Sequence, residues 1–285
     1  MASMRDIKRR KESIQSTQQI TKAMKLVSTV KFQRAKNRAD ANKYYFDLMY
    51  DSMCDILALS EKINHPYLQD SGTGKNVVIL ITSNRGLAGG YNSNVSKLVT
   101  EEMGTEQTSI YCVGRKGMEY MNRKGYEILR DDSDVINAPL YRDAMLISKY
   151  LLEKYSAGEI RSIHLAYTDF VNTVTHVPTM RQLLPVTDLS TEEKTQRRVR
   201  NMMNYDGEEE EMLDSLIPQY MASLIYGGML SSVASENGAR MQAMDNATSN
   251  ADEMISDLSL AYNRARQGSI TQELTEIIGG ADAIS

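Results

Sequence analysis

The stretch of the sequence best suited to ligand chemistry is glycine-rich, SNRGLAGGYN, at residues 83–92. It follows a short apolar run and precedes a helical pattern, which is where doubly wound α/β folds bind phosphate. It has neither the GxGxxG nor the GxxxxGKS/T spacing of a phosphate-binding loop, and Arg85 is its only basic residue. A second turn, from Gly114 to Gly117, precedes a helix in the same way. Tight turns explain both stretches, and a nucleotide-binding α/β enzyme using residues 83–92 stays as the alternative.

No catalytic or metal-binding set stands out elsewhere. The histidines and cysteines are few and scattered: His65, His164, His176, Cys54 and Cys112. This scatter disfavours a zinc site, and none of the histidines lies in a GxSxG context. We expect Cys112 to be an inert buried thiol and His176 to be a strand residue. The acidic residues Asp131, Asp132 and Asp134 fall in a polar stretch, where a solvated loop is expected. We therefore predict no catalytic residue, no metal and no cofactor.

Charge is distributed unevenly along the chain. The net charge is −4, but residues 1–43 hold twelve basic and three acidic side chains, so this segment is +9 and the rest is −13. Three interpretations remain open for the basic segment: a solvated face, a nucleic-acid patch, or a surface that slides against an acidic protein ring. The second lacks interleaved aromatic residues, and the third needs electrostatic steering without fixed salt bridges. The asymmetry favours an acidic partner.

The C-terminal part of the chain carries a heptad pattern. From Leu213 to Ala265, residues spaced alternately three and four apart form one seam, most of them apolar or small. This period is typical of a left-handed coiled coil, and the many small residues allow close approach of a second helix. A single long core helix in a bundle is the other interpretation, although globular helices average only about 11 to 12 residues.

The N-terminal part carries a stripe that we expect to pack on that seam: Ile7, Ile14, Ile20, Ala23, Met24, Val27 and Val30, then Tyr45, Leu48, Met49, Ser52, Ile56 and Leu59. Taking 3–58 and 208–284 as helices paired antiparallel, the second is longer by about 30 Å. Beyond Ala265 the apolar residues need a sheath from another protein: Ile270, Leu274, Ile277, Ile278, Ala281 and Ile284. Pro218 predicts a kink or a break in the C-terminal helix.

The pattern in the middle of the chain predicts an α/β domain. Strands are expected at 77–82, 109–113, 160–170 and 173–184, and helices at 92–103, with Asn92 as its cap, 116–123 and 140–155. Right-handed crossovers then give a mostly parallel sheet with an antiparallel edge. The predicted fold is α/β: a long antiparallel coiled coil of the N- and C-terminal helices with a central Rossmann-like domain. The predicted divisions are 1–60, 61–207 and 208–285.

Several long motifs resemble the gamma subunits of rotary ATP synthases. The stretch ITQELTEIIGGADA at 270–283 resembles the family's C-terminal signature, and SENGARMQAMDNAT at 235–248 and LAYNRARQ at 260–267 continue the similarity upstream. STQQITKAMKLVSTVKFQRA at 16–35 resembles the N-terminal helix, and residues 83–92 resemble the central glycine turn. That turn has Asn84 and Ala88 where Asp and Cys are usual in the family.

The resemblance implies a rotor shaft that is not itself an enzyme. Such a subunit transmits torque between a membrane c-ring, driven by protons or sodium ions, and a catalytic hexamer of three alpha and three beta subunits; it also binds epsilon. Contact with a beta catch loop is implied for Arg266 and Gln267. Bearing and coupling contacts are implied for Met24, Ile270, Thr271, Glu273, Ile277 and Ile278. A basic face toward beta is implied for Lys8, Arg9, Arg10, Lys11, Lys22, Lys25 and Lys31.

The sequence and the family resemblance also give expectations for location and for redox control. No apolar run approaches the ~18 residues of a membrane span and no signal-like apolar core opens the sequence, so direct membrane insertion is not expected. A bacterial gamma subunit would lie at the cytoplasmic face of the plasma membrane as a peripheral protein. Thiol regulation, which chloroplast-type members have, is not expected from Cys54 and Cys112, which lie far apart. A generic coiled-coil scaffold is a further alternative, and no nucleic-acid partner is predicted.

Overall fold

The computed structural model describes residues 4–59, 65–69, 72, 74–173, 175–186 and 209–282. Within those ranges the side chains of 43, 45–47, 50, 52–59, 209–212 and 279–282 are not described. Cys54, several residues of the N-terminal stripe, Ala281 and Ile284 therefore lie outside the described side chains. Two compact units emerge: one combines residues up to Thr29 with those from Arg240 onward, and the other is Val30–Ala239.

The second unit contains one five-stranded sheet with the order β3-β2-β1-β4-β5. Its strands are β1 Lys75–Ile81, β2 Thr108–Val113, β3 Glu127–Asp131, β4 Ile160–Phe170 and β5 His176–Leu184. The first four are parallel, and β5 pairs antiparallel with β4. This confirms the predicted mostly parallel sheet with an antiparallel edge. Strand β3 was not predicted, because its five residues, EILRD, are half polar and form the edge beside β2.

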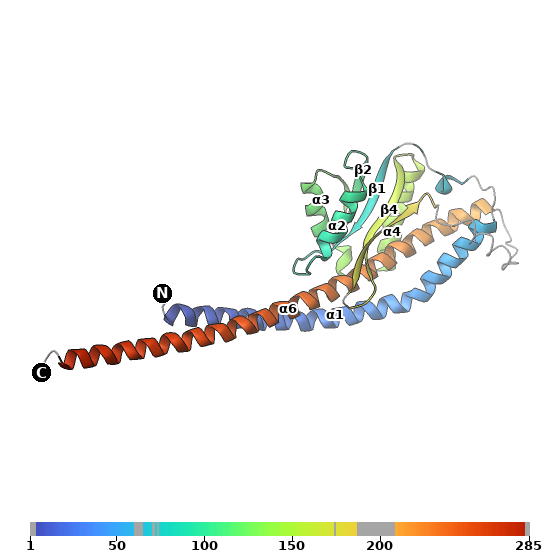
Figure 1. Ribbon diagram of the computed structural model, residues 1–285. Helices are drawn as coiled ribbons and strands as arrows, with labels where there is room; N and C mark the ends of the chain where they lie inside the picture. Colours follow the sequence, from blue (N-terminus) through green and yellow to red (C-terminus); the bar gives the residue numbers. More distant parts are fainter. Residues whose placement is uncertain are drawn as a thin grey trace. The chain divides into compact units, whose positions relative to one another are not determined.

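Helices cover both faces of this sheet (Figure 1). On one face α2 Tyr91–Glu102 and α3 Arg115–Arg123 pack on Val78, Leu80 and Ile110. On the other, α4 Tyr141–Ser156 and the first part of the C-terminal helix pack on the alternate residues of the same strands, such as Ile79 and Ile81. Because β1 and β2 are buried on both faces, each contains a continuous apolar run without alternation, at 77–81 in β1 and 110–113 in β2. Two short 3-10 helices, Pro66–Leu68 and Val135–Asn137, complete the unit.

The two long helices are α1 Met4–Leu59 and α6 Glu209–Asp282, in agreement with the predicted ranges. Helix α6 runs through Pro218 as one helix, so a break at that residue is not found. The carbonyl oxygens nearby accept hydrogen bonds from α4: Ser148 Oγ donates to Pro218 at 3.0 Å and the Tyr141 hydroxyl to Gln219 at 3.4 Å. Side chains of α4 thus hold the helix where proline removes a backbone donor. Among the residues that the structure describes, no helix is long and apolar enough for a transmembrane span.

Candidate functional site

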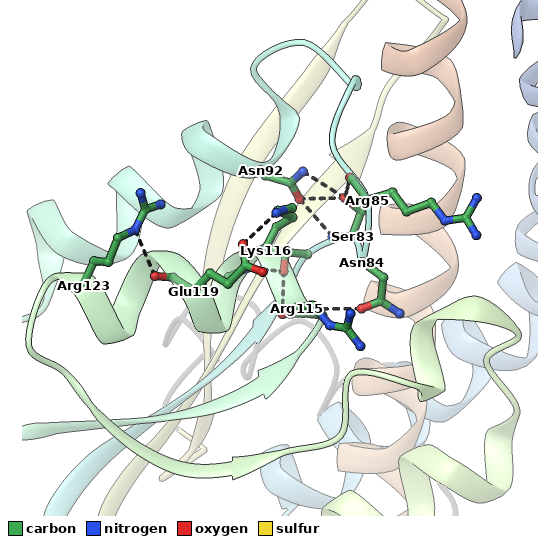
Figure 2. Close-up of polar contacts among 11 residues, drawn as sticks. Ser83, Asn84, Arg85, Asn92, Arg115, Lys116, Glu119 and Arg123 are labelled. Carbon is green, nitrogen blue, oxygen red and sulfur yellow. Dashed lines mark hydrogen bonds and ion pairs between the residues drawn. The ribbon is translucent and has the colours of Figure 1, made fainter.

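The glycine-rich turn lies at the carboxyl end of β1, and its own side chains close it (Figure 2). The Ser83 N–H donates to Asn92 Oδ1 at 2.9 Å. The Ser83 hydroxyl donates to the Arg85 carbonyl oxygen at 2.6 Å and accepts from Asn92 Nδ2 at 2.8 Å. Asn92 is therefore not the helix cap that the sequence pattern predicts: α2 begins at Tyr91 with Gly90 as its N-cap. The Asn92 side chain ties the two ends of the turn together instead.

The same turn occupies the first N–H groups of α3. Three donors of the helix start have acceptors from the end of β1 and the turn: Arg115 N–H to Asn84 Oδ1 at 2.9 Å, Lys116 N–H to the Ser83 carbonyl at 3.0 Å, and Gly117 N–H to Thr82 Oγ1 at 2.8 Å. A phosphate at a helix N-terminus binds through these free donors. Because they are used internally, the N-terminus of α3 does not favour phosphate binding, and the turn at 83–92 that the nucleotide-binding alternative uses supplies acceptors for two of these donors.

Gly114 permits this close packing between α3 and β1. Its φ is +132°, a conformation that side chains rarely adopt, and an added Cβ would lie 2.1 Å from the Thr82 carbonyl oxygen. The Asn84 side chain also donates to the Ser133 carbonyl at 2.7 Å, so the turn joins three loops at this edge of the sheet. Both glycine turns are therefore explained as structural clamps.

The histidines lie on separate elements and the described cysteine is inert. His65 caps a 3-10 helix through Nδ1, and its Nε2 lies 3.2 Å from Asp214 Oδ1. His164 and His176 lie in β4 and β5, and burial lowers the pKa of each. Burial raises the pKa of the Cys112 thiol to about 12, so it remains protonated at neutral pH. These residues do not form a nucleophile with its base.

Two of the acidic residues are held by neighbours, contrary to the expected solvated loop. Asp131 ends β3 and accepts the Ser133 N–H at 3.1 Å. Asp132 accepts from the Tyr111 hydroxyl and from Arg130 Nε. Burial and this carboxylate raise the pKa of Tyr111 above its usual range. Within the described ranges no three His, Cys, Asp or Glu side chains come together as a possible metal site.

The first unit is an antiparallel helix pair, for which the α6 seam was correctly predicted. Gln18 Nε2 donates to Asp252 Oδ1, the hydroxyls of Thr21 and Thr248 lie 2.7 Å apart, and Lys25 Nζ lies 2.6 Å from Asp245 Oδ1. Along α6 the less exposed positions keep the predicted three-four spacing: Met241, Met244, Thr248, Ala251, Ile255, Leu258, Tyr262 and Ala265. Small and polar residues at this contact let the two helices exchange direct hydrogen bonds.

The face of α1 that packs on α6 differs from the predicted stripe. The inward residues are Ile7, Lys11, Ile14, Gln18, Thr21, Lys25, Ser28, Phe32 and Ala35. Ile20, Val27 and Val30 are instead 56%, 57% and 53% exposed, and Ala23 is exposed as well. The prediction was wrong for these four residues because the inner face of α1 is polar in its middle, so apolar content there does not mark the contact. It was also wrong for Leu48, which is 53% exposed.

Glutamine substitutions on the face of α1 that contacts α6 and on its exposed face should have different effects on stability. Thr21→Gln places a longer side chain against Thr248 in the buried contact and should cost about 1 to 3 kcal/mol of the free energy of unfolding. Val27→Gln replaces an exposed side chain on the same helix and should stay within about 0.5 kcal/mol. Urea-induced unfolding of the full chain, followed by the helical circular dichroism signal, measures both. A larger loss for Val27→Gln would mean that the apolar stripe faces α6 after all.

Beyond the helix pair, α6 is unaccompanied by α1. Continuing the observed pairing along both helices places Met4 opposite residue 266, so residues 267–282 extend past the start of α1. Apolar side chains on this end are exposed, with Ile277 at 69% and Ile278 at 61%. Ile270 and Leu274 are about half exposed. An exposed apolar helix end of this kind is typical of a segment that another protein covers.

The residues singled out by resemblance lie on this unit or its continuation in α1. Arg266 and Gln267 are exposed where pairing with α1 ends, and Thr271 and Glu273 are exposed on the unaccompanied end. Met24 is half-buried beside the helix contact. In the basic set, Lys25 is engaged with Asp245 and Lys11 is half-buried, whereas the others are exposed: Lys8, Arg9, Arg10, Lys22 and Lys31.

Comparison with known sequences matches nearly the whole chain to one family. A family model described as ATP synthase matches residues 3–284. The ATP synthase gamma chain of Lachnoclostridium phytofermentans is 58% identical over 100% of both chains. That of Alkaliphilus metalliredigens is 40% identical, covering 99% of this chain and 98% of the relative. A gamma chain of Acetobacterium woodii described as sodium ion specific is 38% identical over 99% of each.

Solved structures share the fold at lower sequence identity. A chain from the Euglena gracilis mitochondrial ATP synthase, in its OSCP/F1/c-ring structure, has a TM-score of 0.70 at 18% identity, covering 99% of this chain and 94% of that chain. A chain from the rotor structure of the same complex has a TM-score of 0.67 at 18% identity, covering 94% and 98%. The combination of long paired helices with this α/β domain is therefore a known architecture.

Proposed function

Because the chain belongs to the ATP synthase gamma chain family, we propose that it is the central stalk of a bacterial-type rotary ATP synthase. In this role it transmits torque between an ion-driven c-ring in the membrane and a hexamer of three alpha and three beta subunits. It is non-catalytic, since nucleotide is bound and converted on the hexamer. It binds epsilon at its base and is peripheral to the cytoplasmic face of the plasma membrane.

The observation that carries the proposal is the unaccompanied end of α6. Residues 267–282 present exposed isoleucines with no α1 segment beside them, so they need an apolar sleeve from another protein. A ring of alpha and beta subunits supplies such a sleeve, and contacts without directional hydrogen bonds allow the helix to turn inside it. Ile270, Thr271, Glu273, Ile277 and Ile278 would lie in this bearing, with Met24 facing the same region.

Turning the shaft would change which state each catalytic site favours. A single helix pair has no threefold symmetry, so it contacts each of three equivalent beta subunits differently, and rotation exchanges those contacts. Arg266 and Gln267 would form a catch that holds a beta loop between steps. The exposed basic residues Lys8, Arg9, Arg10, Lys22 and Lys31 would face acidic loops of beta, with Lys11 and Lys25 at the margin of that face.

Reconstitution with purified alpha and beta subunits tests this function. The chain should co-purify with the hexamer and raise its ATP hydrolysis, whereas a variant lacking residues 267–285 should bind and activate more weakly. The chain alone should remain monomeric in sedimentation and should neither bind nor hydrolyse nucleotide. A symmetric homodimer would support a generic scaffold, and nucleotide turnover by the isolated chain would support the enzyme alternative; either result would refute the stalk.

A further inference from the structure

Strand β4 extends beyond β1, one of its two neighbours in the sheet. Its pairing with β1 extends only to Leu80 and Ala166, while β4 itself continues to Phe170. On its other side β5 pairs with it along this whole segment. The end of β4 therefore needs other hydrogen-bond partners on the β1 side, because buried backbone groups are rarely left unpaired.

Three serines of α6 provide these partners. Ser231 Oγ accepts the Phe170 N–H at 2.8 Å, and Ser232 Oγ accepts the Thr168 N–H at 3.3 Å. The Ser235 hydroxyl donates to the Thr168 carbonyl at 3.3 Å. Serines inside a helix commonly bond back to their own helix, as Ser223 does to the Gln219 carbonyl at 2.8 Å. The hydroxyls of three other serines instead bond to the backbone of β4, where a further strand would otherwise supply the partners: Ser231, Ser232 and Ser235.

The end of the β4–β5 pair also contacts both long helices. The Phe170 ring lies 5.3 Å from the Phe32 ring of α1 and 6.0 Å from His176, measured between ring centroids. On α6, an added Cβ at Gly238 would lie 2.8 Å from His176 Cε1. The glycine therefore allows the histidine ring to rest directly on the helix.

We propose that this contact transmits torque between the α/β domain and the two long helices. We name it the hairpin clamp, in which the end of the β4–β5 pair is held by Ser231, Ser232, Ser235 and Gly238 of α6 and by Phe32 of α1. Both helices then turn with the α/β domain. The proposal rests on the function above, in which the domain is driven at its base and the helices act on the hexamer. Apolar packing between α6 and the sheet is non-directional, whereas hydrogen bonds to the strand backbone fix register and resist sliding.

The first test measures the clamp in the isolated full chain. Ser231→Ala, Ser232→Ala and Ser235→Ala combined should speed hydrogen–deuterium exchange of the Thr168 and Phe170 amides by about tenfold, since both lose their acceptors. Exchange at Ile163 and Leu165, in the part of β4 beside β1, should not change. Ser223→Ala is the matched control, because that hydroxyl bonds only within α6. Unchanged exchange at Thr168 and Phe170 would overturn the clamp whatever the function of the chain.

The second test uses the complete complex in membrane vesicles. The triple variant should retain ATP hydrolysis, which needs only the helices in the hexamer, while ATP-driven ion pumping per ATP falls to about half, because rotation is lost between helices and domain. Pumping per ATP equal to that of the Ser223→Ala complex would overturn the torque role. If the unmodified chain supports neither hydrolysis nor pumping, the proposed function fails, and the torque role with it, while the exchange result still stands for the clamp alone.

Discussion

Gly114→Ala is expected to destabilise the α/β domain by about 3 kcal/mol or more of unfolding free energy. Two costs combine at this position. The backbone φ of +132° is strained for any residue with a side chain, and the new Cβ would overlap the Thr82 carbonyl oxygen at 2.1 Å. Relief would require α3 to move away from β1, which breaks the hydrogen bond from Gly117 N–H to Thr82 Oγ1. Urea-induced unfolding of the purified chain measures the loss.

Alanine substitutions at two other glycines distinguish the cost of backbone strain from the cost of the Cβ overlap. Gly125 has a φ of +83° but no atom within 4 Å of an added Cβ, so Gly125→Ala should cost only about 1 kcal/mol through strain. Gly86 has an open position and no positive φ, so Gly86→Ala should stay within about 0.5 kcal/mol. Equal stability of the Gly114 and Gly125 variants would mean that the overlap with Thr82 is relieved without cost.

The combined substitution of Arg266 and Gln267 by alanine is expected to lower ATP turnover of the reconstituted complex by about tenfold or more, with assembly intact. Both side chains are exposed where pairing with α1 ends, so neither contributes to the helix contact. A hydrogen bond from the charged Arg266 would be worth about 1.5 to 3 kcal/mol and one from the neutral Gln267 about 0.5 to 1.5 kcal/mol, so losing the proposed catch should slow the steps that depend on it.

Arg264→Ala is the matched control for this variant. Arg264 is an exposed arginine of the same helix, and at 100° per residue it lies about 160° around the helix from Arg266 and about 60° from Gln267, so it controls for loss of the arginine charge. The control complex should keep normal turnover, and circular dichroism should show the same helix content for all variants. Undiminished turnover in the double variant would remove Arg266 and Gln267 from the proposed coupling mechanism, and loss of assembly would assign them to binding instead.

Much of the fold was predictable because strong periodic patterns report burial directly. The VVILIT run at 77–82 indicated a strand buried on both faces, and the three-four spacing along α6 identified its inner face from Met241 to Ala265. Strand β3 was missed because a short, half-polar edge strand has no such pattern. The sites were less predictable: the glycine turn indicated a tight bend, but not that Asn84 and Ser83 would occupy the amides of α3.

The amino-acid sequence by itself determined the two long helices, the mostly parallel sheet apart from strand β3, and the family to which the chain belongs, because these depend on local spacing and on long contiguous motifs. Only the tertiary structure decided which face of α1 meets α6, where Thr21 and Lys25 lie inward and Val27 outward. Only the tertiary structure likewise revealed that three serines complete the end of β4. The physical reason is that these polar contacts join residues far apart in the sequence, and the periodic pattern of apolar residues along one segment does not specify which polar atoms of another segment lie within hydrogen-bond distance.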